Sequence, residues 1–216
     1  MGRTIVQLNP DWLARANAPP AKPRSLDIHT GRSMPERMRS LFDGVTRSIL
    51  DPKTEIRSAE AMRGAPARDD ESEIRVAANW IRQRVAYRGE IPGFDIFPTL
   101  EATLEIGAAD CNRFCVVGCA LFTSRGYATG VRIVMWNQHE GHAYNLLRLP
   151  RQACASSQST VPLDLSEGGA PLGWECDLRS AMSVQDYWYE PLPWIAWYKS
   201  GTSIVSAPLP VPRKPT

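Results

Sequence analysis

The sequence has little net charge, few histidines and no long apolar run. Its 216 residues carry a net charge of +2 and three histidines, and the longest apolar stretch spans only residues 115–122. A membrane-spanning helix needs about 20 apolar residues, and binding to nucleic acid or anionic lipid usually requires clustered positive charge. We therefore expect a protein that uses neither nucleic acid nor a membrane as its partner.

Targeting signals and paired cysteines are scarce as well. The first residues, MGRTIVQLNPDWL, lack the apolar core of a secretory signal, so we expect a cytoplasmic protein. The five cysteines form an odd number, and three of them fall together at positions 111, 115 and 119. A disulfide framework needs cysteines that are paired and spread along the chain. The expected state is therefore free thiols in a reducing compartment.

Composition divides the chain into three parts. Residues 1–32 lack periodicity and contain 19-PPAKPR-24, which indicates an extended N-terminal arm. Residues 33–186 form the predicted domain, and residues 187–216 form a segment rich in aromatic residues and proline. Within the domain helices come first and an antiparallel run of strands follows, which is an α+β pattern.

Apolar spacing and capping signals place the elements of this domain. A helix begins at Ser33, where 33-SMPE-36 matches a capping box, and ends at 51-DP-52. A polar link is expected over residues 53–68. The remaining elements are expected as helices over 69–85, 100–106 and 111–126 and as strands over 127–136, 142–149 and 160–165.

The helix expected from residue 111 begins with a cysteine that directly follows an acid. Asp110 is a good N-cap, which places Cys111 at the first helical position. The main-chain amides and the dipole of a helix start stabilise a thiolate, the form of cysteine that attacks a carbonyl carbon. The Cys111 N–H is also the natural donor to an oxyanion. The charge of Asp110 works against the thiolate, so an imidazolium partner is still needed.

His142 and Asp164 are the residues that fit the remaining roles of a triad. His142 begins an expected strand, which is a rigid mount for a general base, and Asp164 ends the next strand. An acid in that place can accept the imidazole N–H and fix its tautomer. Cys111, His142 and Asp164 therefore occur in order on three consecutive elements.

Two other interpretations of the cysteines stay open from the residues alone. A helix rises about 1.5 Å per residue, which separates Cys111 and Cys119 by roughly 12 Å along the axis. One zinc ion, with Zn–S bonds of about 2.3 Å, cannot hold both. Cys111 and Cys115 could share a metal with two histidines. The second interpretation is packing, with an apolar stripe facing the strands that consists of Cys115, Gly118, Cys119 and Phe122.

Taken together, these motifs carry a family resemblance. The stretches 109-ADCN-112, 125-RGYATGVRIV-134, 141-GHAYNLL-147 and 162-PLDLS-166 resemble the transglutaminase-like superfamily of papain-like cysteine enzymes, particularly its bacterial and phage-encoded members. The resemblance covers Trp80 to Asp164. One departure is Asn112, where many members carry a second acid.

The resemblance implies a fold and a function. It implies a papain-like core with N-terminal helices on an antiparallel sheet, and Cys111 as nucleophile, His142 as base and Asp164 as orienting acid. The implied reaction is acyl transfer at a peptide or glutamine amide bond through a thioester, and it requires no metal or organic cofactor. The alternative is a non-catalytic structural or binding module on the same fold, for example a component of a phage particle or its assembly.

Tryptophans supply the remaining candidate residues. Trp136 and Trp174 flank the proposed site in the sequence, and we expect them either to line a substrate groove or to belong to the core. The stretch 187-YWYEPLPWIAWY-198 either packs on the domain or, through Trp188, Trp194 and Trp197, contacts a protein partner. The proline-rich end and the N-terminal arm would extend such a contact.

Overall fold

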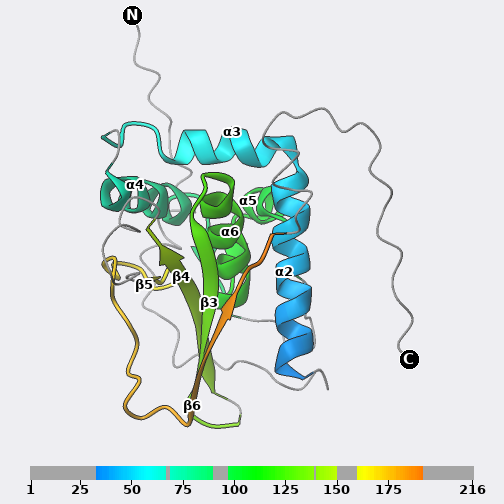
Figure 1. Cartoon of the computed structure of the whole chain (residues 1–216), viewed down its shortest axis with the longest axis vertical. Coiled ribbons are helices and arrows are strands. Elements are labelled where there is room, and N and C mark those ends of the chain that lie inside the picture. Colours follow the sequence, from blue (N-terminus) through cyan, green and yellow to red (C-terminus); the bar gives the residue numbers. More distant parts are fainter. Residues whose placement is uncertain (1–32, 67–68, 90–96, 139, 150–159, 192–216) are drawn as a thin grey trace, which may run out of the picture.

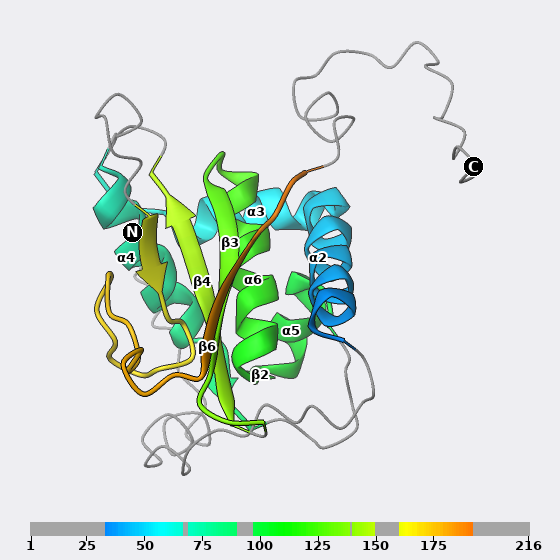
Figure 2. The ribbon, with the colours of Figure 1, turned by 60° about the horizontal axis from the view of Figure 1, so that its bottom comes forward.

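One helix lies directly on an antiparallel sheet, and the other helices gather around that helix. The structure, a computed structural model, describes residues 33–66, 69–89, 97–138, 140–149 and 160–191. In this part of the chain, α6 (Cys111–Ser124) packs on strands β3 and β4, and α2, α3 and α5 pack against α6 (Figures 1 and 2). The predicted α+β class is confirmed.

The first helix follows its capping signals. α2 (Met34–Leu50) begins after Ser33, whose N–H and hydroxyl both donate to the Glu36 carboxylate at 2.8 Å. Its apolar face, predicted from the helical spacing, is buried in the core. The helix ends at Asp51, as the 51-DP-52 signal predicts.

The polar link expected from residue 53 is wrong, because α3 (Pro52–Ala61) begins at once. Asp51 caps this helix by accepting from Lys53 N at 2.9 Å, and Pro52 occupies the first turn, where proline is tolerated. The inward positions of α3 are Thr54, Ser58 and Ala61. These small or polar side chains give no apolar period, which is why the sequence pattern did not predict the helix.

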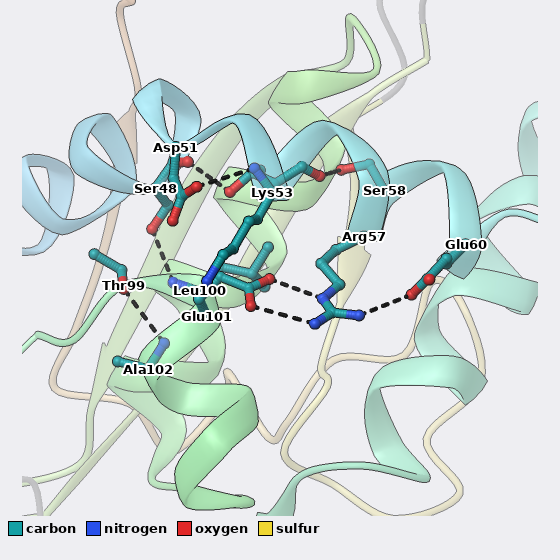
Figure 3. Close-up of polar contacts among 11 residues, drawn as sticks. Ser48, Asp51, Lys53, Arg57, Ser58, Glu60, Thr99, Leu100, Glu101 and Ala102 are labelled. Carbon is teal, nitrogen blue, oxygen red and sulfur yellow. Dashed lines mark hydrogen bonds and ion pairs between the residues drawn. The ribbon is translucent and has the colours of Figure 1, made fainter.

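Polar contacts tie α5 to the helices before it (Figure 3). The Arg57 guanidinium pairs with Glu101, with Nε 2.8 Å from Oε1, and the Ser48 hydroxyl accepts from Leu100 N at 2.9 Å. α5 (Leu100–Ile106) ends at Gly107, which has a left-handed conformation with φ of 67°. The chain then enters β2 (Ala108–Ala109), which pairs in parallel with β1 (Ala86–Tyr87) and leads directly to α6.

The predicted helix over residues 69–85 is confirmed as α4 (Asp70–Arg82), with Asp69 as its cap. Its apolar face, including Ile74 and Ile81, is fully buried. α4 packs on α3 and brings its last residue, Arg82, to the loop that follows β5. Among the described residues, no helix is long and apolar enough to cross a membrane.

The sheet has the strand order β5-β4-β3-β6 and is antiparallel throughout. The predicted strands appear as β3 (Ala128–Met135), β4 (Gly141–Arg148) and β5 (Thr160–Leu163). β3 and β4 pair over their whole lengths, with Val134 opposite His142, whereas β5 pairs only with the second half of β4. The first half of β4, which carries His142, therefore extends beyond β5.

A fourth strand, β6 (Ser183–Trp188), was not predicted. It is an edge strand whose residues Val184, Gln185 and Asp186 are exposed, so it shows little of the apolar alternation that reveals a strand. The boundary expected between the domain (residues 33–186) and the C-terminal segment (residues 187–216) falls within this strand. Tyr189, just beyond it, is buried, and its ring lies 5.6 Å from that of Phe42 on α2.

Trp188, one of the aromatic residues proposed to contact a partner, lies against the domain. The Arg148 guanidinium stacks over its ring at 3.9 Å, and the ring packs beside a buried cluster on the outer face of the sheet. Trp194 and Trp197 lie outside the described residues, as do the N-terminal arm and the proline-rich end.

The apolar stripe predicted on α6 is buried against the sheet. Gly118 lies so close to Asn145 of β4 that a Cβ at position 118 would overlap the Asn145 carboxamide. Asn145 Nδ2 donates to the Cys115 carbonyl at 3.0 Å and lies 3.3 Å from Cys119 Sγ. One side chain of β4 thus fixes where α6 sits along the strand.

Gly118→Ala should therefore destabilise the protein by up to about 2 kcal/mol, measured by urea unfolding. Alanine normally favours a helix by about 1 kcal/mol over glycine, so a loss must come from overpacking, which costs about 1–3 kcal/mol. Gly168→Ala, at a position with open space around it, is the control and should change stability by less than about 0.5 kcal/mol. A Gly118→Ala protein more stable than wild type would contradict the close helix–sheet contact.

Candidate active site

Cys111 occupies the first position of α6. Asp110 caps the helix, with its Oδ1 accepting from Arg113 N at 2.8 Å, and Arg113 Nε lies 3.7 Å from Oδ2. Burial raises the pKa of Asp110, and the Arg113 contacts and the charge of Arg37 oppose that shift. The Cys111 side chain is buried at the positive end of the α6 dipole, the environment in which a thiolate is stabilised.

His142 and Asp164 form a buried pair on neighbouring strands. His142 is the second residue of β4, and Asp164 directly follows the last residue of β5. His142 Nε2 lies 2.6 Å from Asp164 Oδ2, and the two residues are 5% and 1% exposed. The structure thus brings together two of the three residues proposed as a triad from their order in the chain.

The environment of Asp164 favours its ionised form. Its Oδ1 accepts from Ser166 N at 2.9 Å, Ser166 Oγ at 2.7 Å and Glu167 N at 3.1 Å. Burial by itself raises the pKa of Asp164, but the hydrogen bonds from His142 and Ser166 outweigh it, and the pKa lies below its usual value. An ionised carboxylate only accepts hydrogen bonds, so the proton between the two residues resides on His142 Nε2.

The other imidazole nitrogen has no such partner. His142 Nδ1 is buried and makes no hydrogen bond within the part of the chain that the structure describes. A buried polar atom without a partner costs free energy, and such atoms are uncommon outside functional sites. Because Nε2 is hydrogen-bonded to Asp164, Nδ1 is the nitrogen available to accept a proton in a reaction.

The start of α6 lies at the same end of the sheet as this pair. Near its C-terminal end α6 contacts Thr129, early in β3, through the Thr123 hydroxyl at 2.7 Å. The opposite end of the helix therefore points toward the start of β4, where His142 lies. Burial raises the pKa of Cys115, one helical turn after Cys111, well above its usual value.

The other described thiols are poor nucleophiles. Burial is the main cause that raises the pKa of Cys119 to about 12 and that of Cys176 to about 11. Together with Cys115, these groups are neutral thiols at physiological pH. Cys154 lies outside the described residues. For the metal alternative, the described residues contain no group of three or more histidine, cysteine or acidic side chains placed to hold an ion.

The two candidate groove tryptophans lie in different places. Trp136 lies two residues after Val134, the cross-strand neighbour of His142, so it is a diagonal neighbour of His142 on the outer face of the sheet. Its Nε1 donates to the Asp177 carbonyl at 2.9 Å, and it packs on the cluster that contains Tyr144. Trp174 lies in the loop between Asp164 and β6, half-buried, with its main-chain N–H on the Pro171 carbonyl.

A cavity of about 390 Å³ opens at the same end of the sheet, between the start of α2 and the ends of β3 and β6. Three methionines and Ile133 give it an apolar wall, and amide side chains form its polar border. One of the methionines, Met135, packs directly on Gly141, the residue before His142. The cavity therefore lies close to the strand that carries the imidazole.

Several residues at this site were not predicted. Ser166 follows Asp164 by two positions, and a D-x-S sequence is a local signal for a turn that folds onto the acid. Asn145 and Arg82 had no local signal, because their contacts join positions about 30 and 82 residues apart. Tyr144, whose ring lies 5.8 Å from that of His142, could have been assigned to the same face from strand alternation.

A scan of the sequence against protein-family models gives no match, and a search of the curated proteins gives none either.

Asp164→Asn should lower stability at pH 7 by about 2 kcal/mol, because it replaces a buried, fully hydrogen-bonded carboxylate. The depressed pKa of Asp164 means that this contribution is present above the unfolded-state pKa of about 3.9 and is lost as the pH falls through the folded-state value. The difference between wild type and variant should therefore shrink in urea unfolding at low pH.

The exposed Asp43→Asn serves as the control for this experiment, since its side chain lies on the solvent face of α2. Its effect should be small at every pH. A wild type and an Asp164→Asn variant with parallel pH profiles would contradict the ionised buried carboxylate.

Proposed function

We propose that this chain is a cysteine acyltransferase or hydrolase of the transglutaminase-like, papain-like type, acting on peptide or glutamine amide bonds through Cys111, His142 and Asp164. The observation that carries the proposal is the His142 imidazole, held by Asp164 through Nε2 while its buried Nδ1 has no hydrogen-bond partner among the described residues. This is the arrangement of a general base awaiting a proton from a nucleophile.

The position of Cys111 supports the nucleophile's role. It is the first residue of α6, at the end of the sheet where His142 and Asp164 lie. The helix dipole stabilises a thiolate there and also an oxyanion formed at the same place. The other described thiols are neutral, with raised pKa values.

The chemistry proceeds in two halves. The Cys111 thiolate attacks the amide carbonyl carbon, a C–S bond forms, and collapse of the oxyanion expels the amine, which takes its proton from the His142 imidazolium. The product of this half is a thioester. Water or a second amine then attacks, His142 Nδ1 accepts the proton of that nucleophile, and collapse releases the Cys111 thiolate. Asp164 stabilises the imidazolium in both halves.

Water and amines lead to different products from the same thioester. Water gives a free acid, so the protein acts as a deamidase or protease, and an amine gives a new amide and hence a cross-link. The methionine-walled cavity near Gly141 offers space for the side chain of a peptide substrate. Methionine side chains are flexible and polarisable, which suits an unbranched substrate side chain.

Iodoacetamide should alkylate Cys111 at least about tenfold faster than any other thiol, because it reacts with thiolates. His142→Ala should lower the Cys111 rate, since it removes the imidazolium that stabilises the thiolate. His139→Ala is the matched control and should leave the rate unchanged. Peptide mapping by mass spectrometry measures each site. Equal labelling of all thiols, or labelling insensitive to His142→Ala, would favour the non-catalytic module instead.

Ammonia release from glutamine-containing peptides tests turnover itself. Cys111→Ala and His142→Ala should abolish release, and Asp164→Asn should lower kcat by about 10²-fold or more, because the imidazole loses its orientation. Adding a primary amine should divert part of the thioester into a new amide, detected by mass spectrometry. Release that persists in Cys111→Ala would exclude this thiol as the nucleophile.

A further inference from the structure

Arg82, the last residue of α4, forms hydrogen bonds with the loop that contains Asp164. Its Nη2 donates to the main-chain carbonyl of Asp164 at 2.5 Å and to that of Ala170 at 3.0 Å. These two carbonyls stand at the two ends of one turn. One guanidinium nitrogen therefore bridges the two ends of the segment that contains Asp164.

The shape of this turn decides where the carboxylate lies. Ser166 and Glu167, both inside the turn, supply all three hydrogen bonds to Asp164 Oδ1. Oδ2 is left to face His142 Nε2. If the turn opened, the donors to Oδ1 would move with it, and the carboxylate would lose the orientation that holds the imidazole.

Arg82 holds this position at a cost in free energy. Burial lowers its pKa, and the charges of Asp164 and Glu167 offset this only in part. Its Nε is buried and has no hydrogen-bond partner within the described residues. Arg82 is half-buried, and within the described residues its guanidinium donates to main-chain carbonyls, whereas arginines in such places usually pair with carboxylates. The specific feature of this arginine is therefore its hold on the main chain around Asp164.

We propose that Arg82 is a positioning residue of the Cys111–His142–Asp164 site, acting through the main-chain carbonyls of Asp164 and Ala170 on the carboxylate that orients His142. The catalytic consequence rests on the proposed function. The link from Arg82 through Asp164 to His142 does not, because it can be measured without any substrate.

The substrate-free measurement is the exchange of the His142 Nε2 proton with solvent, followed by NMR and assigned by its loss in His142→Ala. Arg82→Met should accelerate this exchange by about tenfold, since a loosened carboxylate shields the proton less. The control is Arg84→Met, whose guanidinium stacks over Trp80 at 4.1 Å on the exposed side of the same helix end. That variant should exchange at the wild-type rate.

A double-mutant cycle separates positioning from general destabilisation. In the Asp164→Asn background, Arg82→Met should produce little further change in the pH profile of Cys111 alkylation, because the group it positions is gone. Additive effects, or an Arg82→Met protein that loses thermal stability while its exchange rate and pH profile stay at wild-type values, would overturn the proposal.

Chemical rescue covers the case in which Arg82→Met does not fold. A cavity of about 290 Å³ borders Arg82, Asn79 and Ala170, so a small guanidinium can approach the vacated position. Arg82→Ala should recover slow Nε2 proton exchange with ethylguanidinium and not with ethylammonium, which lacks the planar fork. Equal recovery with both cations, or none with either, would count against the positioning role.

These outcomes distinguish the two proposals. If Arg82→Met accelerates exchange but wild-type Cys111 is not alkylated selectively, the acyl-transfer function fails and the positioning of Asp164 by Arg82 stands. If Cys111 is selectively alkylated but Arg82→Met behaves like Arg84→Met, the positioning role fails and the function stands.

Discussion

The contact between Gly118 of α6 and Asn145 of β4 holds the helix that begins at Cys111 against the strand that carries His142. The carboxamide occupies the space that a side chain at position 118 would need, and its Nδ2 donates to the Cys115 carbonyl. This fixes both the height of the helix above the sheet and its position along the strand. Cys111 lies one helical turn before Cys115, and His142 lies three residues before Asn145, on the opposite face of β4. The contact therefore fixes the register between the helix and the strand that carry these residues, because a strand that slipped by one residue would turn each side chain to the other face.

Buried polar atoms that lack a hydrogen-bond partner cost free energy, and in the described part of this protein they belong to residues that contact the candidate site or the helix that begins at Cys111. Among the described residues, three buried side-chain atoms lack a hydrogen-bond partner, and they belong to Arg82, His142 and Asn145. Each of these residues also makes a bond that holds the site: to the Asp164 loop, to the Asp164 carboxylate and to α6. A fold selected only for stability would avoid such atoms. Their concentration here is the pattern of a site whose geometry is maintained against stability.

Features set by neighbouring residues, such as helix caps, could be predicted from the sequence, whereas contacts between distant segments could not. The capping box at Ser33 and the cap at Asp110 predicted where two helices begin, since a cap involves only residues within one turn. α3 was missed because its inward positions are small or polar, and β6 because most of its residues are exposed, so neither shows an apolar period. Of the site, the order of Cys111, His142 and Asp164 was visible, and the His142–Asp164 hydrogen bond follows from the adjacency of β4 and β5. Arg82 was not predictable, because nothing near it in the sequence indicates that its guanidinium reaches the turn after Asp164.

The three cysteines of α6 show how one helical period gives identical side chains different chemistry. Positions 111, 115 and 119 are four residues apart and share one stripe of the helix. The stripe faces the sheet and all three cysteines are buried, and burial raises the pKa of Cys115 and Cys119. The first member has no preceding turn to cover it from the same helix, and it lies where the dipole ends. Packing that makes Cys115 and Cys119 inert therefore directs Cys111 toward the end of the sheet. That end is also where β4, the strand that carries His142, extends beyond β5.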